Sequence, residues 1–66
     1  MINLTRINDA LLVVNAELIE FVESSPDTII TLTTGHKYLV KESVDEVIEK
    51  VKEYRRSLLP NPLTGG

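Results

Sequence analysis

The spacing of apolar residues changes near residue 43, and this change limits the folds that the chain can adopt. Before that point, short runs rich in β-branched residues alternate with turn residues, which is typical of strands. After it, apolar residues recur at helical spacing, namely Val44, Val47, Ile48, Val51, Tyr54 and Leu58. We therefore predict an α+β fold, in which an antiparallel β-meander of about five short strands precedes one C-terminal amphipathic helix.

Turn residues mark the ends of the expected strands. The turn clusters are Asn8-Asp9, Ser24-Ser25-Pro26-Asp27 and Thr34-Gly35, and residues of these types favour tight turns. They predict strands over residues 2–7, 11–14, 19–23, 28–33 and 37–41, with a short turn over residues 16–18.

The register of the first hairpin stays open. A turn that ends at Asp9 sets Leu4 opposite Val13. A turn that ends at Ala10 sets Leu4 opposite Val14 instead and changes the composition of one face of the hairpin. The sequence does not decide between these two pairings.

The helix has a marked beginning and a marked end. Ser43 and Glu46 have the spacing of a capping box, in which each side chain accepts a hydrogen bond from the backbone of the other residue. Early acidic residues (Asp45, Glu46 and Glu49) and late basic residues (Lys50, Lys52, Arg55 and Arg56) complement the helix dipole. We expect the helix to stop near Leu59, because Pro60 and Pro62 follow. Residues 1–59 then form a single domain, and residues 60–66 form a flexible Pro/Gly tail.

The chain is small for an independently stable domain. It has 66 residues and no cysteine, so it contains neither disulfides nor a cysteine-based zinc site. A domain of this size buries only about 60% of the surface that its unfolded form exposes. Self-association is therefore the expected source of additional stability.

The expected strands carry apolar residues on both faces, although one helix covers only one face of a sheet. We hypothesise that the remaining face packs against a second copy of the chain, which gives a homo-oligomer. The interface residues predicted for it are Ile29, Tyr38, Val40, Leu11 and Val13. The alternative is that the turn over residues 16–18 and the tail cover this face.

The beginning of the chain and its apolar runs predict a cytoplasmic protein without membrane insertion. Residues 1–6 lack the basic and apolar regions of a secretory signal. The longest apolar run, residues 10–14, is far shorter than the roughly 20 residues that span a bilayer as a helix.

No residue pattern predicts catalysis, a metal site or a cofactor. His36 is the only histidine, and a metal site needs several ligands. Ser24, Ser25 and Ser43 belong to a turn or a cap and have no recognisable base beside them. We interpret the carboxylates Glu17, Glu20 and Glu23 as a solvated edge rather than as acid/base groups.

The basic end of the helix is the only cluster with a recognition chemistry. Lys52, Arg55 and Arg56 lie close together in the sequence. They either complement the helix dipole and keep the helix soluble, or contact an acidic or phosphate-bearing partner. A formal net charge of -3 opposes nucleic-acid binding.

Several stretches between Met1 and about Arg56 share one family pattern. They are Ile2-Asn3-Leu4-Thr5-Arg6-Ile7-Asn8, Asn15-Ala16-Glu17-Leu18-Ile19-Glu20, Pro26-Asp27-Thr28, Thr31-Leu32-Thr33 and Tyr38-Leu39-Val40-Lys41-Glu42-Ser43. Together they resemble the small flagellar FlbD family, also called the swarming motility protein SwrD family. That family has Asn-Gly where this chain has Asn8-Asp9 and Thr34-Gly35, so we expect different turn types within the same hairpins.

The resemblance implies a function in motility. It implies a bacterial cytoplasmic protein near the flagellar basal body, which supports motor power and swarming through contacts with stator or basal-body proteins, and it carries no catalytic motif. An alternative from another class is a small DNA-binding regulator of the LytTR type, in which the cluster of Lys52, Arg55 and Arg56 would hold phosphates. An enzyme is the third class, and no set of nucleophile, base and orienting group supports it.

Overall fold

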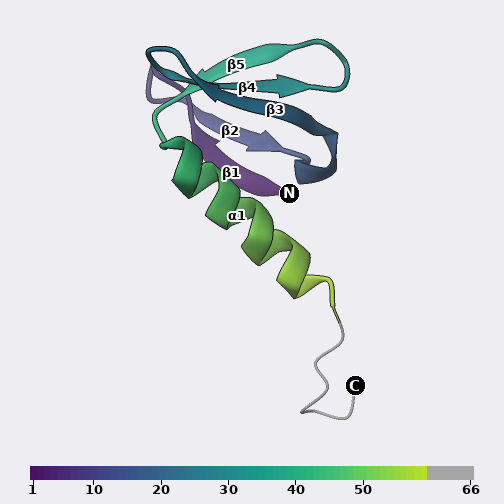
Figure 1. The fold of residues 1–66 in the computed structure, drawn as a ribbon. Helices are drawn as coiled ribbons and strands as arrows, with labels where there is room; N and C mark the ends of the chain where they lie inside the picture. Colours follow the sequence, from purple (N-terminus) through teal and green to yellow (C-terminus); the bar gives the residue numbers. More distant parts are fainter. Residues whose placement is uncertain (60–66) are drawn as a thin grey trace.

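The computed structural model describes residues 1–59, which form five strands and one α-helix (Figure 1). The strands are β1 (Ile2–Thr5), β2 (Leu11–Val14), β3 (Ile19–Ser24), β4 (Thr28–Leu32) and β5 (Lys37–Val40); a 3-10 helix, η1, spans Ala16–Leu18, and α1 spans Val44–Ser57. The predicted α+β fold, with antiparallel strands followed by a C-terminal helix, is confirmed. The predicted flexible tail, residues 60–66, lies outside the described residues.

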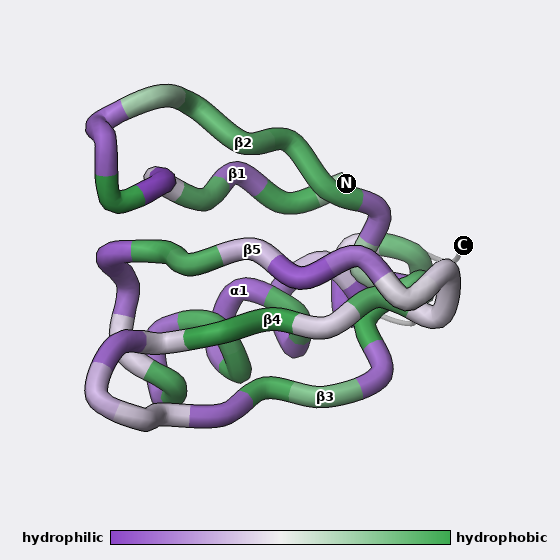
Figure 2. The backbone as a smooth tube through the Cα atoms, turned by 90° about the horizontal axis from the view of Figure 1, so that it is seen from above, coloured by the Kyte–Doolittle hydropathy of each residue, from purple (hydrophilic) through white to green (hydrophobic). Residues whose placement is uncertain are grey.

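The strands form two antiparallel sheets, β1-β2 and β3-β4-β5. An isolated bridge between Arg6 and Val40 connects the end of β1 to β5. The strands consequently lie side by side in the order β2, β1, β5, β4, β3, with α1 behind them in the view of Figure 2. The expected meander is thus divided after β2, where η1 intervenes, and β2 and β3 lie at opposite margins.

The first hairpin adopts neither of the two predicted registers, so both predictions are wrong. Leu4 lies opposite Leu12. The turn is closed by Arg6, whose N–H donates to the carbonyl oxygen of Ala10 over 2.8 Å. Asp9 takes the left-handed conformation, with φ of 70°, which aspartate tolerates better than most residues. The turn therefore begins one position earlier than the Asn-Asp pair indicated, and the partner of every residue in β1 changes.

One core fills the space between the strands and α1. Its buried apolar side chains are Ile2, Leu4, Val14, Ala16, Ile30, Leu32, Val40 and Val47. The helix contributes Val47, which is fully buried, and the half-buried Val51 and Tyr54. The predicted helical face continues to Leu58, but this residue is 60% exposed, because the last turn of α1 runs beyond the strands (Figure 1).

The predicted capping box is present at the start of α1. The Ser43 hydroxyl accepts a hydrogen bond from the Glu46 N–H over 3.1 Å, and the Glu46 carboxylate accepts one from the Ser43 N–H over 3.2 Å. These bonds satisfy backbone N–H groups that the first helical turn leaves without a partner. A local sequence signal therefore fixes where the helix begins.

Replacing Ser43 with alanine is expected to lower the free energy of unfolding by about 0.5–2 kcal/mol, because an N-cap oxygen is lost. Urea titration followed by circular dichroism measures the change. Ser57→Ala is the matched control, since it removes a serine hydroxyl that donates to the Tyr54 carbonyl oxygen at the other end of the same helix. Equal losses in the two variants would contradict a specific stabilisation by the cap.

Candidate functional site

The outer face of the three-stranded sheet, which points away from α1, carries exposed apolar side chains. Ile29 of β4 lies directly opposite Leu39 of β5. Phe21 of β3 lies opposite Thr31, so it is the diagonal neighbour of Ile29 on the same face. Phe21 is 56% exposed and Leu39 is 38% exposed, whereas Ile29 is half-buried. We call Phe21, Ile29 and Leu39 the outer sheet patch.

The floor of the outer sheet patch contains a buried polar residue. Thr31, opposite Phe21, is 8% exposed, and its hydroxyl has no hydrogen-bond partner within residues 1–59. Glu23 and Lys37 lie on the same face, as the strand partners of Ile29 and Thr31. The patch is therefore an apolar surface with charged residues at its margin.

A second exposed apolar surface lies on β2, at one margin of the fold. Leu11 is 69% exposed and Val13 is 52% exposed. Their partners on β1 are Thr5 and Asn3, so all four side chains share the face that points away from the core. We call Leu11 and Val13, together with the free backbone edge of their strand, the β2 edge.

The predicted interface residues do not form one surface. Leu11 and Val13 are exposed and Ile29 is half-buried, and these three lie on outward faces. Val40, in contrast, is 2% exposed and belongs to the core, and Tyr38 packs against the core from the same face. The alternation of side chains along β5 turns both residues inward, so we withdraw Val40 and Tyr38 from the predicted interface.

The predicted basic cluster lies on exposed parts of α1. Lys52, Arg55 and Arg56 are all exposed, and the Lys52 ammonium nitrogen lies 3.7 Å from a Glu49 carboxylate oxygen. Lys52 and Arg55 also line a groove of about 350 Å³ between α1 and β3. The other lining residues are Ala16, Ile19, Glu20, Val22, Val47, Ile48 and Val51. The cluster is thus mixed with carboxylates and borders an apolar groove.

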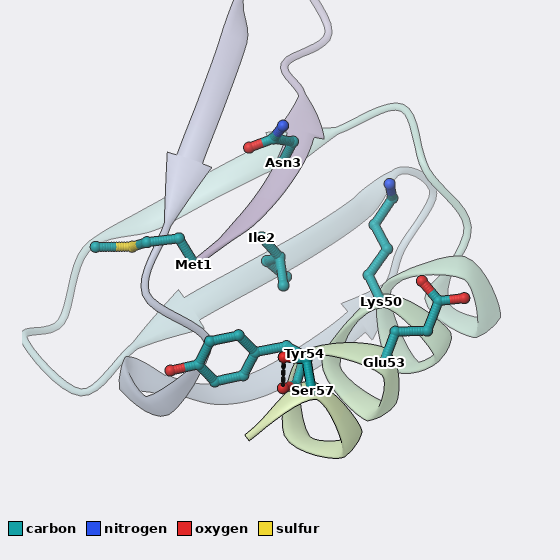
Figure 3. A pocket seen from close by; sticks show the side chains of 7 residues that line it. All are labelled: Met1, Ile2, Asn3, Lys50, Glu53, Tyr54 and Ser57. Atoms are coloured by element: carbon teal, nitrogen blue, oxygen red, sulfur yellow. Dashed lines mark hydrogen bonds between the residues drawn. The ribbon is translucent and has the colours of Figure 1, made fainter. Parts of the chain in front are cut away.

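A further groove of about 340 Å³ lies between β1 and α1 (Figure 3). Its lining residues are Met1, Ile2, Asn3, Lys50, Glu53, Tyr54 and Ser57. Within this set the Ser57 hydroxyl donates to the Tyr54 carbonyl oxygen over 2.6 Å, which gives a hydrogen-bond partner to a carbonyl group in the last turn of α1. That hydroxyl is therefore used for backbone hydrogen bonding rather than being paired with a base.

His36 lies in the turn between β4 and β5. The His36 Nδ1 is 2.8 Å from the Thr34 hydroxyl oxygen, and both side chains are exposed. Within residues 1–59, no three histidine, aspartate or glutamate side chains gather as metal ligands.

The contact between Glu42 and Thr5 was not predicted. The Glu42 carboxylate accepts hydrogen bonds from the Thr5 N–H, at 2.9 and 3.1 Å, and from the Thr5 hydroxyl, at 3.0 Å. Beside it, the Lys41 N–H donates to the Thr5 carbonyl oxygen over 2.8 Å, and the Lys41 ammonium group pairs with Asp9. These contacts join the two sheets, and no local sequence signal indicates them because the partners are 32 to 37 residues apart.

The environment of Glu42 favours its charged form. Partial burial, the largest single influence, raises the pKa of the carboxyl group. The hydrogen bonds from Thr5 and from the backbone N–H of Glu42, together with the positive charge of Lys50, outweigh this influence. The pKa of Glu42 is consequently below its ordinary value of 4.5.

Comparison with known proteins identifies the family to which the chain belongs. Within residues 1–59, no helix combines the length and the apolar character that crossing a membrane requires. No curated protein matches the chain, and no solved structure matches it. The family model FlbD, described as flagellar and swarming motility proteins, matches residues 1–59. Because the match covers every described residue, the chain belongs to the FlbD family of flagellar and swarming motility proteins.

Proposed function

We propose that the chain supports flagellar motility and swarming through contacts with other proteins, as a self-associating subunit rather than as an enzyme. Membership of the FlbD family supports the cellular role. The observation that carries the mechanism is the outer sheet patch, where Phe21 and Leu39 expose apolar surface next to Ile29. Contiguous apolar surface with a charged margin is typical of protein-binding sites.

The outer sheet patch contains an aromatic side chain, Phe21, that can serve as the central contact of a protein interface. An aromatic side chain buries about 150–250 Å² when a partner covers it, and aromatic residues are frequent among those that dominate binding energy. The underlying strands hold Phe21 in a fixed place, because β3 pairs in regular register with the central strand β4 from Phe21 to Ser24. A partner therefore meets a largely preformed surface.

The partner that we propose is a component of the flagellar motor, either a stator or a basal-body protein, which the chain meets at the cytoplasmic side of the inner membrane. The family resemblance supports this choice. The exposed cluster of Lys52, Arg55 and Arg56 is a second contact region for an acidic segment of the same partner. It is less suited to nucleic acid, because Glu49 pairs with Lys52 and the net charge is -3.

Phe21→Lys is expected to reduce swarming strongly while the protein still folds, since the side chain is mostly exposed. Loss of an aromatic anchor weakens protein binding by on the order of tenfold or more. The variant replaces the chromosomal copy in a motile host, and swarm expansion, motor torque and cellular protein level are recorded.

Leu58→Lys is the matched control, because Leu58 is 60% exposed but lies at the end of α1, outside the outer sheet patch. It should swarm normally at the same protein level. Normal swarming and torque in the Phe21→Lys strain would show that this patch is not the contact site. Normal motility after complete deletion would contradict the proposed function itself.

A further inference from the structure

We infer that two copies of the chain join through their β2 strands, which pair antiparallel about a twofold axis and continue the sheet from one copy into the other. This inference rests on the self-association proposed above and assigns it to one strand. The outer sheet patch is not part of this contact, so the two surfaces serve different partners.

The backbone of β2 has a free edge. In antiparallel strands, residue pairs that exchange backbone hydrogen bonds alternate with pairs that do not. Because Arg6 donates to Ala10, the bonded pairs of this hairpin are Leu4 with Leu12 and Ile2 with Val14. The N–H and C=O groups of Leu11 and Val13 therefore point away from β1, and within residues 1–59 β2 pairs with no other strand.

The side chains of β2 also suit a second copy. The strand reads Leu-Leu-Val-Val, and it is coloured as hydrophobic along its whole length in Figure 2. It carries no charge, no proline and no bulge, which are the features that usually protect an edge strand from pairing. Two such strands approach each other without electrostatic repulsion, and the pairing buries Leu11 and Val13, which are more than half exposed.

The opposite margin of the fold shows the protection that β2 lacks. β3 carries Glu20 and Glu23, and its pairing with β4 is irregular between Ile19 and Phe21. Antiparallel pairing of two β3 strands would bring these carboxylates together, and the bulge would interrupt the ladder. Self-association through strand pairing is consequently directed to β2.

The free backbone groups also define a register. Every available hydrogen bond forms when Leu11 lies opposite Val13 of the second copy and Leu12 lies opposite Leu12 of the second copy. In this register the twofold axis passes between the two Leu12 residues. The contact is self-complementary and closed, which gives a dimer rather than a fibre.

Amide hydrogen exchange of the wild-type chain, measured at high and low protein concentration, tests the register directly. The N–H groups of Leu11 and Val13 are expected to exchange at least about tenfold more slowly at high concentration, because pairing protects them. The N–H of Val22, which by the same alternation points away from β4 at the free edge of β3, is the internal control and should show no dependence on concentration.

Sedimentation of variants in which lysine replaces an apolar residue tests whether the β2 edge is the contact between the two copies. Val13→Lys should be monomeric at concentrations where the wild type and Phe21→Lys are dimeric, since Val13 and Phe21 are similarly exposed apolar residues of edge strands. Circular dichroism checks that each variant is folded, and Leu11→Lys replaces Val13→Lys if the latter is unfolded.

The possible outcomes distinguish failure of the β2 contact from failure of the proposed self-association as a whole. A wild-type chain that stays monomeric at every concentration overturns both self-association and the β2 contact. A wild-type dimer with unprotected Leu11 and Val13 amides, or one that survives Val13→Lys but not Phe21→Lys, overturns only the β2 contact. A β2 edge that is protected only when a different protein is added likewise overturns pairing with a second copy.

Discussion

Ile30→Ala is expected to remove a substantial part of the free energy of unfolding of the protein. Ile30 is fully buried in the central strand β4, and truncation of a buried isoleucine costs about 2–5 kcal/mol. For a chain of 66 residues, the total free energy of unfolding is on the order of 3–10 kcal/mol. The expected loss is therefore a substantial part of the whole stability of the domain.

Urea titration followed by circular dichroism measures this loss, with all variants at one protein concentration because the proposed self-association would contribute to stability. Leu58→Ala is the control for deletion of aliphatic atoms, since Leu58 is largely exposed at the end of α1. It should change the free energy of unfolding by less than about 0.5 kcal/mol. If the two substitutions had similar effects, the core described for residues 1–59 would be wrong.

Glu42→Ala is expected to lower the free energy of unfolding by about 1–3 kcal/mol, because it removes the acceptor for the Thr5 backbone N–H. Water replaces part of this bond, since the contact is only partly buried, and this places the loss in the lower half of the range. Glu42→Gln keeps an acceptor oxygen but removes the charge, so it should cost less. The comparison separates the hydrogen bond from its charge assistance.

The charge on Glu42 also makes the stability depend on pH. Its pKa is lowered in the folded protein, so the unfolded state binds a proton at a higher pH than the folded state does. The contribution is fully present above the ordinary value of 4.5 and is lost as the pH falls through the pKa of the folded state. Raising the pH above neutrality should leave this contribution unchanged.

Chemical unfolding of the wild type and Glu42→Gln between pH 3 and pH 7 tests this dependence, since the difference between the two proteins isolates Glu42 from the other carboxylates. The wild type should be the more stable protein at pH 7, and the difference should shrink in acid. A difference that stays constant over the whole range would show that the charge does not contribute to the contact between the sheets.

The two proposed contacts use separate surfaces of this small domain. The β2 edge lies at one margin of the fold, and Phe21 of the outer sheet patch lies on β3 at the opposite margin (Figure 2). Pairing through β2 would add buried area that the small core lacks. It would leave Phe21 of both copies exposed to the proposed motor partner, so that the dimer would present two contact sites.

The parts of the fold that the sequence predicted are those set by neighbouring residues. The capping box of Ser43 and Glu46 acts within one turn of helix, and the spacing of Val47, Val51 and Tyr54 places these residues on one face. The strands of the second sheet follow from the β-branched run in β4 and from the turn at Gly35, which has φ of 92°. The family was also predicted from the sequence, because its residue pattern extends over nearly the whole chain.

The sequence was less informative about which apolar residues face outward. It placed Val40 and Tyr38 with Leu11 and Val13 in one interface, although alternation along β5 directs the first two inward. It also missed the register of the first hairpin, because the turn types allowed for Asn8-Asp9 did not include one that begins at Ile7. Both errors concern the direction of side chains, which changes completely when pairing shifts by one residue.

By itself, the sequence determined the class of the fold, the position of its helix and the family to which the chain belongs. Only the tertiary structure decided how the two sheets join, which strand keeps a free edge and where Phe21 is exposed. The physical reason is that periodicity and capping are properties of adjacent residues. The contact between Thr5 and Glu42, in contrast, and the order of strands that it supports, form only when distant segments of the chain meet.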